Sequence, residues 1–412
     1  MVITGGLLLF LHSCYKEVEV GGPLGGEERD VFEMTVSAEM QNLLFTSRDT
    51  GYSILEPELS LQLNGQPLSI RKMSIRGKNA LDFRRKSYSV SLNQPIVLTS
   101  ADGTRVRVMK KFKLISMAMD YTYISNRVGF GILEKAGIMP LFYKFVELRM
   151  NGQTQGIYFL VEDPGAYVEG LDSECLLRRD YNHYIIKLDY NPSKWFLPEE
   201  EYRARFREIY ATLTTEKGDA LYEILSEKMV LDEYFRKMGI DYLLQNGDYT
   251  DEIFFYSTVE NQKIRFRILP WDYDDIFMEN PHEVGRSWGT GTLFGTRTYA
   301  SREDIYAEIG NRLIFSIEDD LDYTIARDSL LYARYEEVLT GMIGDLSAGD
   351  IDELFRQIER ELTPFYNDAE LIEQSHYDRY PCNRGEWEQN MIDKQAFLTE
   401  RLEWMKSELK LP

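Results

Sequence analysis

A segment near the middle of the chain, residues 245–278, predicts a β-hairpin. One acidic loop precedes its first strand, and another follows its second strand. Apolar and charged residues alternate in its second strand, KIRFRIL, as they do in a strand with one buried face. The loop before the hairpin contains Asp248, Asp251 and Glu252, and the loop after it has the sequence WDYDD. Because a hairpin brings its two ends together, we expect these carboxylates to lie close to one another. Clustered carboxylates can hold a divalent cation and orient a hydroxyl group for phosphoryl transfer.

Strand patterns dominate the N-terminal half of the chain. The most distinct hairpin covers residues 143–161, where Asn151-Gly152 tolerates the positive φ values of a type I′ turn. Glu162 closes the second strand of this hairpin. A further alternating segment, RRKSYSVSL, predicts a strand on which Lys86 lies on the apolar face.

Helical patterns dominate the C-terminal half. They begin at Glu199 and return from about Arg302 to the end of the chain, whereas residues 163–198 are irregular and aromatic. The Gly-rich stretch 280–298 predicts a loop. A helix is also predicted earlier in the chain, capped by Asp120 or Thr122, and it extends to about Ala136. The fold class expected from these patterns is α+β, with a β-rich N-terminal half and a helical C-terminal half.

The charge balance limits the class of partner. The chain has 68 Asp and Glu against 47 Lys and Arg, with a net charge of -21. This excess of negative charge argues against nucleic acid or an anionic membrane surface as the main partner. It does not exclude a nucleotide, because a bound cation can offset the phosphate charge. The cysteines fit no zinc spacing and the histidines are scattered, so neither a zinc site nor a histidine-based triad is predicted.

The N-terminus carries a pattern typical of export. The apolar run at residues 3–11 is too short to span a bilayer, and it leads into the letters LHSC, which resemble a lipobox. We therefore predict a lipoprotein signal peptide over residues 1–13, lipidation of Cys14 and a polar, Gly-rich tether over residues 14–30. An ordinary signal peptide, or a buried cysteine at this position, is the alternative.

The residues after the cysteine bear on location. Lys16-Glu17 resembles the surface-export signal of Bacteroidota lipoproteins. The predicted location is the cell envelope, as an outer-membrane lipoprotein that faces the periplasm or the cell surface. On this prediction the protein contacts the membrane only through its lipid anchor.

Several segments of the chain resemble, in the same order, the motifs of the spore-coat CotH kinase family of atypical protein kinases. They are Arg76-Gly77 with Arg85-Lys86-Ser87-Tyr88, Asp120 with Asn126-Arg127, the hairpin VELRMNGQTQGIYFLVE, Asn246-Gly247-Asp248, and Pro270-Trp271-Asp272-Tyr273-Asp274. The resemblance covers a domain of about residues 31–405. It implies a two-lobed, protein-kinase-like fold, with an N-lobe at about 31–163 and a C-lobe at about 164–405, and ATP-dependent phosphoryl transfer.

The resemblance implies a nucleotide site in the N-lobe. Lys86 would contact the nucleotide phosphates, with Arg85 as the neighbouring basic alternative. Glu162 would line the lobe junction near the nucleotide. No GxGxxG motif lies near Arg76, so a glycine-rich phosphate loop is not predicted.

The resemblance places the chemistry on the two acidic loops. Asp248 would orient or deprotonate the acceptor hydroxyl, which belongs to a protein substrate that the sequence does not name. Asp272 would hold Mg²⁺ or Mn²⁺, with Asp274 as a second ligand or as its support.

The chain departs from the family at a second metal ligand, because Ile253 stands where an Asn is usual. The preceding Asp251 and Glu252 would substitute, since Mg²⁺ accepts any hard oxygen. Two classes of function follow from this departure. The chain is a secreted, lipid-anchored protein kinase, or it is a catalytically inactive CotH-like surface lipoprotein that acts as a binding or adhesion module. Calcium-dependent glycan binding through the same carboxylates is a third hypothesis.

Overall fold

The computed structural model describes residues 29–49, 53–54, 58–120, 122–171, 173, 175–180, 185–190, 197–248, 250, 252–260, 263–286, 289, 293–375 and 382–411. The predicted signal peptide, the predicted lipidation site Cys14 and the predicted metal ligand Asp251 lie outside these residues. Within the described part of the chain, Cys175 and Cys382 are buried thiols that form no disulfide.

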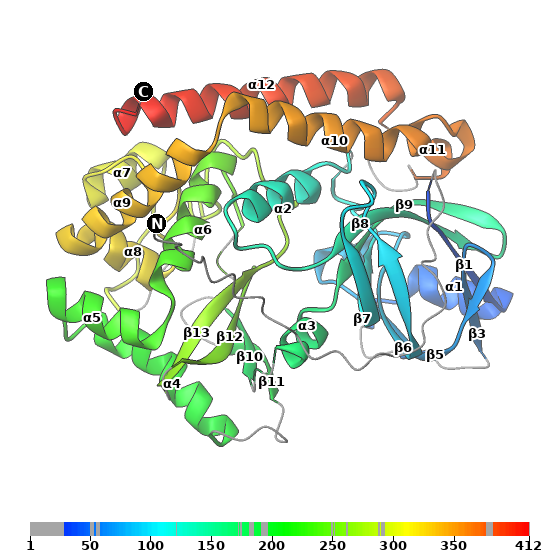
Figure 1. Ribbon diagram of the computed structural model, residues 1–412, viewed down its shortest axis with the longest axis horizontal. Coiled ribbons are helices and arrows are strands. Elements are labelled where there is room, and N and C mark those ends of the chain that lie inside the picture. The colour runs from blue at the N-terminus through cyan, green and yellow to red at the C-terminus, as the bar shows by residue number, and fades with distance from the viewer. Residues whose placement is uncertain are drawn as a thin grey trace, which may run out of the picture.

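Strands of the N-terminal half form one large mixed sheet, on the right in Figure 1. Across the sheet they are β2 (Ser53–Ile54), β5 (Ile70–Arg76), β6 (Ser87–Thr99), β7 (Val106–Ile115), β9 (Gln153–Glu162), β8 (Tyr143–Met150), β1 (Val31–Val36), β3 (Leu59–Leu63) and β4 (Gln66–Leu68). The strands β1 and β8 run parallel, and the consecutive strands β5, β6 and β7 pair antiparallel. The predicted hairpin is confirmed as β8 and β9, and Asn151 and Gly152 in its turn both have positive φ.

One face of this sheet packs on α1 (Ala38–Thr46), a helix that the sequence analysis did not predict. Ser37 caps it by accepting a hydrogen bond from the Met40 amide. In β6, Tyr88 and Val90 are buried in this smaller hydrophobic core and Ser89 between them is only partly buried. The period-2 pattern that predicted the strand therefore also identified its core face.

The β8–β9 hairpin connects this smaller core to the main core of the molecule. Tyr158 and Leu160 of β9 belong to the smaller core. Phe159 and Val161, which point to the opposite face, belong to the main core. Strands buried on both faces have near-continuous apolar sequences, and GIYFLV in β9 is an example.

A second, smaller sheet carries the central hairpin. Its order is β11 (Ile185–Tyr190), β10 (Cys175–Arg179), β12 (Ile253–Glu260) and β13 (Lys263–Pro270), with antiparallel neighbours. The predicted hairpin at residues 245–278 is thus confirmed. The prediction that residues 163–198 are irregular was wrong, because this segment contains α3 (Pro164–Gly170), β10 and β11. The strand β10 is nearly all buried, so it lacks the alternation that marks a half-buried strand.

The C-terminal half is helical, as predicted, and the α+β fold class is confirmed. Its helices are α4 (Glu199–Thr212), α5 (Gly218–Lys228), α6 (Leu231–Leu244), α7 (Arg302–Ile309), α8 (Asp320–Arg327), α9 (Ser329–Asp345), α10 (Ala348–Tyr366), α11 (Ala369–Ser375) and α12 (Arg384–Glu408). In the N-terminal half, α2 (Ser125–Lys135) follows Asp120, which accepts a hydrogen bond from the Ser125 amide at 2.7 Å. None of the helices described is long and apolar enough to cross a membrane.

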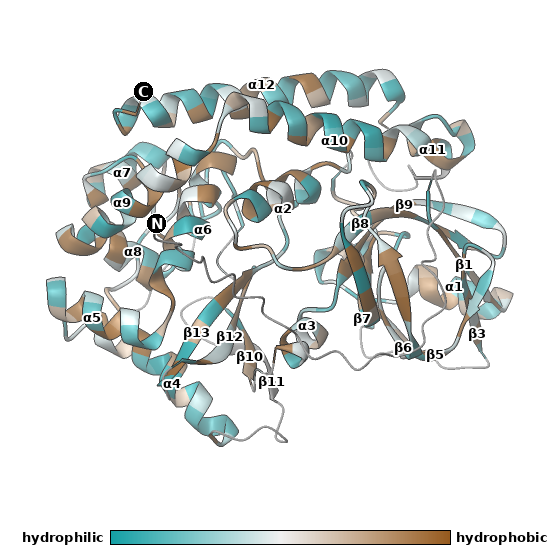
Figure 2. Cartoon of the chain, viewed as in Figure 1, coloured by the Kyte–Doolittle hydropathy of each residue, from teal (hydrophilic) through white to brown (hydrophobic). Residues whose placement is uncertain are grey.

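The helices α10 and α12 pack against each other along one edge of the molecule and, with α11, reach from the C-terminal helices to strand β9 (Figure 1). Their outward faces are largely hydrophilic, whereas the strands beneath are hydrophobic (Figure 2). Arg127 of α2 forms an ion pair with Glu361 of α10 at 2.7 Å. This C-terminal arm, α10–α12, therefore joins the two halves of the chain.

Candidate active site

The first acidic loop begins where α6 ends. Gln245 follows the helix in the left-handed conformation, with φ 50° and ψ 59°, which is a common way to end a helix. Arg401 of α12 donates from Nε to the Leu243 carbonyl at 2.9 Å and from Nη2 to the Tyr242 carbonyl. These bonds satisfy carbonyls that a helix leaves open at its C-terminus. The helix end from which the Asp248 loop starts is thereby held by α12.

Asp241, one turn before the end of α6, connects the helix to both acidic loops. Its Oδ2 accepts a hydrogen bond from Lys237 Nζ at 2.6 Å. Its Oδ1 accepts from Asn246 Nδ2 at 3.2 Å and from the Tyr273 hydroxyl at 2.9 Å. All of these side chains are buried. A buried carboxylate with such partners orients the residues that surround it, because each donor would lose a bond if it moved.

Backbone hydrogen bonds hold the two acidic loops against each other. The Gly247 amide donates to the Asp275 carbonyl at 2.9 Å, and the Met278 amide donates to the Gln245 carbonyl at 3.0 Å. A Cβ on Gly247 would lie 2.9 Å from Met278 Cγ and 3.2 Å from Asp275 Oδ2. Only glycine therefore permits this close approach without movement of the neighbouring side chains.

Tyr273 anchors the second acidic loop in the core. Its amide donates to Asn126 Oδ1 of α2 at 2.8 Å, and its side chain is fully buried. A Cβ on Gly129 of α2 would lie 2.4 Å from Tyr273 Cβ, so the helix packs directly on this residue. Asp272 has a φ of 51°, a conformation that costs energy for a residue other than glycine and that is common at functional sites. Asp272 and Asp274, which flank the anchor, are only partly buried.

Several carboxylates interact at this place. Burial raises the pKa of Asp274 well above its usual value, and the negative charges of Asp272, Asp275, Asp120 and Asp248 raise it further. The structure thus places Asp248 and Asp274, which the sequence analysis assigned to the acceptor and the metal, within range of each other. Such a concentration of negative charge favours a bound cation.

The carboxylate oxygens of the acidic loops are the type of ligand that a hard divalent cation such as Mg²⁺ prefers. Among the residues described, no three His, Cys, Asp or Glu side chains are arranged as a ready metal site. Mg²⁺ does not need such a set, because it is commonly held by one or two carboxylates together with water and substrate phosphates. Asp272 and Asp274 would be the residues that hold it, and both stay predictions.

The other predicted metal ligand, Glu252, has a protein partner. Its Oε1 accepts a hydrogen bond from Arg178 Nη2 at 2.6 Å. Ile253 begins β12 and is fully buried in the main core, so the chain offers no polar group at the position where the family often has Asn. A carboxylate that accepts from Arg178 at Oε1 can still coordinate a metal ion through Oε2, so the proposed substitution by Glu252 stays a prediction.

Arg85 and Lys86 are both 2% exposed but differ in their surroundings. Arg85 donates from Nη1 to the Tyr123 hydroxyl at 3.0 Å and from Nη2 to the carbonyls of Ser116 and Ile157. Lys86 donates from Nζ to the Leu81 carbonyl in the 3-10 turn Asn79–Asp82, between β5 and β6. Arg85 is thus held inside the protein, whereas Lys86 lies beneath the turn that follows the Arg76-Gly77 motif.

Two further basic residues, Arg76 and Lys113, were missed as site candidates. Lys113 of β7 contacts Asp163 Oδ2 at 2.6 Å and Ser89 Oγ at 3.0 Å. Burial lowers the pKa of Arg76, and the charges of Asp272 and Glu252 act against that effect. Arg76 therefore lies near the second acidic loop, and its guanidinium also packs over the Trp271 ring at 5.6 Å. The alternation in KKFKLI could have indicated Lys113, but its partner Asp163 could not be seen from sequence.

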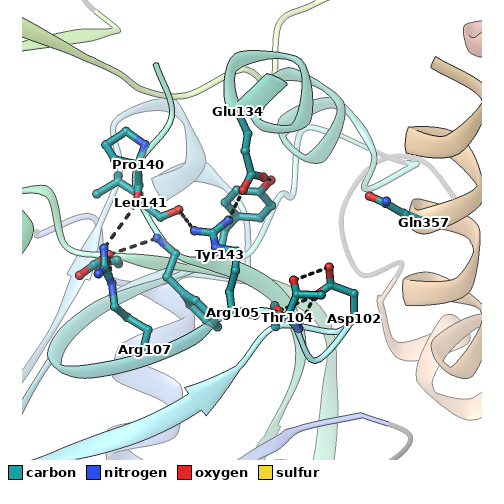
Figure 3. A network of polar contacts seen from close by, with 12 residues as sticks. Asp102, Thr104, Arg105, Arg107, Glu134, Pro140, Leu141, Tyr143 and Gln357 are labelled. Carbon is teal, nitrogen blue, oxygen red and sulfur yellow. Dashed lines mark hydrogen bonds and ion pairs between the residues drawn. The ribbon is translucent and has the colours of Figure 1, made fainter. Parts of the chain in front are cut away.

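Glu162 is tied into the connection between α2 and β8. Its Oε2 accepts hydrogen bonds from Arg107 Nε at 2.9 Å and from the Phe142 amide at 3.1 Å. Burial raises the pKa of Glu162, and the charge of Arg107 opposes this rise. Figure 3 shows the same connection from close by, with Arg107 directed at the Pro140 carbonyl and Arg105 placed between Glu134 and the Leu141 carbonyl. The predicted contact of Glu162 with the nucleotide stays a prediction.

His282 is the other site residue that sequence reasoning missed. Its Nε2 forms an ion pair with Asp275, and its Nδ1 lies 3.8 Å from Asp248 Oδ1. The hydrogen bond with Asp275 raises the pKa of His282 from its usual value, against the effect of burial. No local pattern indicates this contact, because His282 stands in the Gly-rich segment that was predicted only as a loop.

Comparison with known proteins finds a matching family model and a distant relative. The family model described as "CotH kinase protein" matches residues 73–405. This range contains every predicted site residue except Cys14. Inner spore coat protein H of Bacillus subtilis (strain 168) is 21% identical over 323 residues, which cover 72% of this chain and 84% of that protein.

A structural match is weaker. The toxin–antitoxin complex of HipA, HipB and operator DNA from Shewanella oneidensis MR-1 gives a TM-score of 0.31 at 10% identity. The match covers 76% of this chain and 63% of that chain. A likeness of this size supports no conclusion about shared structure or function.

Proposed function

This chain belongs to the CotH kinase family, and we propose that it is a protein kinase that transfers the γ-phosphate of ATP to a protein hydroxyl with the help of a divalent metal ion. The observation that carries the proposal is the pair of acidic loops held together by the bond from the Gly247 amide to the Asp275 carbonyl. The charge of Asp248 on one loop acts on Asp274 of the other, which supports a shared site. Phosphoryl transfer needs mainly positioning and charge neutralisation, and such loops supply both.

Asp248 is the residue proposed to receive the acceptor. Its side chain is 32% exposed, so a hydroxyl can approach it, while its backbone is fixed through Gly247. The carboxylate orients the hydroxyl toward the phosphate or accepts its proton.

Asp272 and Asp274 are proposed to hold Mg²⁺ or Mn²⁺. When bound, the metal ion neutralises the charge that develops on the transferring phosphate. Tyr273 lies between the two aspartates, and its buried anchor on Asn126 and Asp241 keeps both carboxylates in place.

The phosphates of the nucleotide need basic side chains. Lys86 is proposed from the family resemblance, and Arg76 and Lys113 are added from their places near Asp272 and Asp163. Arg85 stays the alternative to Lys86, since both side chains are buried and donate to backbone carbonyls.

The proposal is tested with purified protein, γ-labelled ATP and Mg²⁺ or Mn²⁺. Wild type should transfer phosphate to itself or to an acceptor protein, and Asp248→Asn should reduce transfer by roughly 100-fold. The same variant should keep the rise in melting temperature that ATP and metal produce, because binding stabilises the native state by mass action. If wild type transfers no phosphate under any of these conditions, the kinase proposal is wrong.

A binding or adhesion module is the second candidate. The observation in its favour is the buried Ile253, which offers no ligand where the family often has Asn, together with the contact that occupies one carboxylate oxygen of Glu252 with Arg178. On this alternative, millimolar ATP with Mg²⁺ should leave the melting temperature unchanged. A rise with Ca²⁺ alone would favour the calcium-dependent reading of the acidic loops.

We also propose that the protein is anchored in the cell envelope by a lipid on Cys14, on the sequence pattern alone. The anchor would place the kinase beside envelope proteins, which would be its substrates. Metabolic labelling with a fatty-acid analogue tests this. Label should appear on wild type and be absent from Cys14→Ala, and equal labelling of both would contradict the anchor.

A further inference from the structure

The contacts of His282 extend the proposed site. The segment after the second acidic loop folds back on the first, so that the His282 amide donates to the Gly247 carbonyl at 3.1 Å. A Cβ on Gly247 would lie 3.3 Å from His282 Cδ2. Backbone and side-chain packing together fix the imidazole next to the loop that carries Asp248.

The imidazole lies between two carboxylates. Nε2 is in contact with Asp275 Oδ2, and Nδ1 faces Asp248 Oδ1 at 3.8 Å. The side chains of His282, Asp248 and Asp275 are 31%, 32% and 33% exposed. All of them are thus partly open to solvent, as a site that meets an acceptor must be. The contact with Asp275 fixes the ring. The distance from Nδ1 to Asp248 Oδ1 is too long for a hydrogen bond, so the ring acts on the Asp248 carboxylate through its charge.

The charges around His282 come from several elements. Asp275 and Asp248 favour the charged imidazole, whereas Arg286 and partial burial disfavour it. Arg286 is itself directed to Glu318, which lies in the segment before α8 and is buried. Glu318 also interacts with Asp248 through its charge. The imidazole therefore sits between the carboxylates of the active site and a neighbouring cation.

We propose that His282 is a positioning residue for phosphoryl transfer: held by Asp275, it fixes the carboxylate of Asp248 in the orientation that meets the acceptor hydroxyl. This inference rests on the proposed function, because it requires Asp248 to act on an acceptor. It adds a residue whose substitution should lower the rate of phosphoryl transfer and leave the affinity for nucleotide nearly unchanged. Within the part of the chain that the structure describes, no hydrogen bond or ion pair joins His282 to Asp272 or Asp274, so its loss should leave metal and ATP binding intact.

The test compares His282→Gln with wild type in steady-state transfer. A glutamine amide can still donate to Asp275 but does not reach Asp248 as the imidazole does. We expect kcat to fall by about ten-fold or more while KM for ATP stays the same, because the altered contact acts on the transfer step. Lys228→Gln is the matched control, since it removes the cation of an ion pair with Glu208 at the end of α5, outside both acidic loops, and it should behave as wild type.

The outcomes separate the inference from the proposed function. If wild type transfers phosphate and His282→Gln matches it in kcat, the positioning role is wrong and the kinase proposal stands. If wild type transfers none, both are wrong. A role of His282 in stability alone would lower the melting temperature and leave kcat per folded molecule unchanged, which also contradicts the inference.

A second measurement does not depend on activity. Long-range ¹H–¹⁵N NMR reports the protonation of His282 in the full chain. We expect its pKa to fall in Asp275→Asn and, to a smaller extent, in Asp248→Asn, because each variant removes a negative charge from one side of the ring. An unchanged pKa in Asp248→Asn would show that the imidazole does not sense Asp248 and would overturn the inference.

Discussion

At the scale of single residues, Asp241 links the helix α6 to both acidic loops. Its carboxylate neutralises Lys237 inside α6 and also holds Asn246 and Tyr273. One side chain thus contributes both to the stability of the helix and to the geometry of the two acidic loops. These contributions can be separated by substitution.

Asp241→Asn should lower the free energy of unfolding by about 3 kcal/mol, because it leaves the buried charge of Lys237 without its carboxylate. The double variant Lys237→Met with Asp241→Leu should recover part of that loss, since it removes both buried charges. It should not recover phosphoryl transfer, because Asn246 and Tyr273 still lack their acceptor. Urea unfolding and a transfer assay give the two readouts. Equal stability of Asp241→Asn and wild type would contradict this account.

Glu318 makes stability depend on pH. Burial and the neighbouring charge of Glu283 raise its pKa from 4.5 to about 8, in spite of Arg286 and Thr250. The folded state therefore binds more protons than the unfolded state between these two values, so the free energy of unfolding should fall as the pH rises from 4.5 to about 8. Glu318→Gln should flatten this slope in urea unfolding at several pH values. A slope that is the same in both proteins would contradict the assignment.

Residue-level prediction from sequence succeeded where a local pattern placed the side chain. Asp248, Asp272 and Asp274 could be put near one another because they flank a hairpin. His282 and Lys113 could not be placed, since their contacts with Asp275 and Asp163 depend on how distant segments fold back. Burial of Arg85 also needs the structure, because a strand pattern tells which residues share a face and not which groups meet them.

At the scale of elements, the close contact of the two acidic loops depends on Gly247. Gly247→Ala would place a Cβ 2.9 Å from Met278 Cγ and 3.3 Å from His282 Cδ2. The loops must then separate, and we expect a loss of about 1–3 kcal/mol in stability and reduced transfer.

The matched control is Gly341→Ala in α9, where a Cβ would meet nothing within 4 Å. This change should raise the free energy of unfolding by up to about 1 kcal/mol, because alanine favours helix over glycine. Calorimetry of both variants checks the pair. A Gly247→Ala protein as stable and as active as Gly341→Ala would show that the loops do not need their close packing.

Element prediction followed the periodicity of the sequence. The β8–β9 and β12–β13 hairpins were found because a turn signal or an alternating strand marked them. The strands β10 and β11 were missed, because CLLRR in β10 is too short and too buried to show a period. The helix α1 was missed for a related reason: its AEMQNLLFT sequence is short and follows a strand with no break other than Ser37.

At the scale of the whole molecule, the C-terminal arm α10–α12 holds the two halves together. Arg127 forms two bonds with Glu361, at 2.9 Å and 2.7 Å, and both side chains are largely buried. Glu361→Gln should therefore lower the free energy of unfolding by about 3 kcal/mol. Glu388→Gln, which breaks the exposed pair with Arg384, should cost less than about 1 kcal/mol. Similar melting temperatures for these two variants would contradict the bracing role of the arm.

The overall α+β division could be predicted because strand and helix patterns separate cleanly along the chain. The arm could not, since nothing local in α10 or α12 tells which distant helix will meet it. Its contact with α2 matters for function, because α2 also carries Asn126, which holds the Tyr273 amide. The arm, α2 and the second acidic loop therefore form one continuous support for Asp272 and Asp274.

Phosphoryl transfer by the two acidic loops is tested by measuring transfer from γ-labelled ATP by wild type and Asp272→Asn across a Mg²⁺ titration. Glu227→Gln, an exposed change in α5, serves as the control. We expect metal-dependent transfer by wild type and the control, with a loss of roughly 100-fold or more in Asp272→Asn. Equal transfer by Asp272→Asn and wild type, or none by wild type at any metal concentration, would show that the loops do not carry out this reaction.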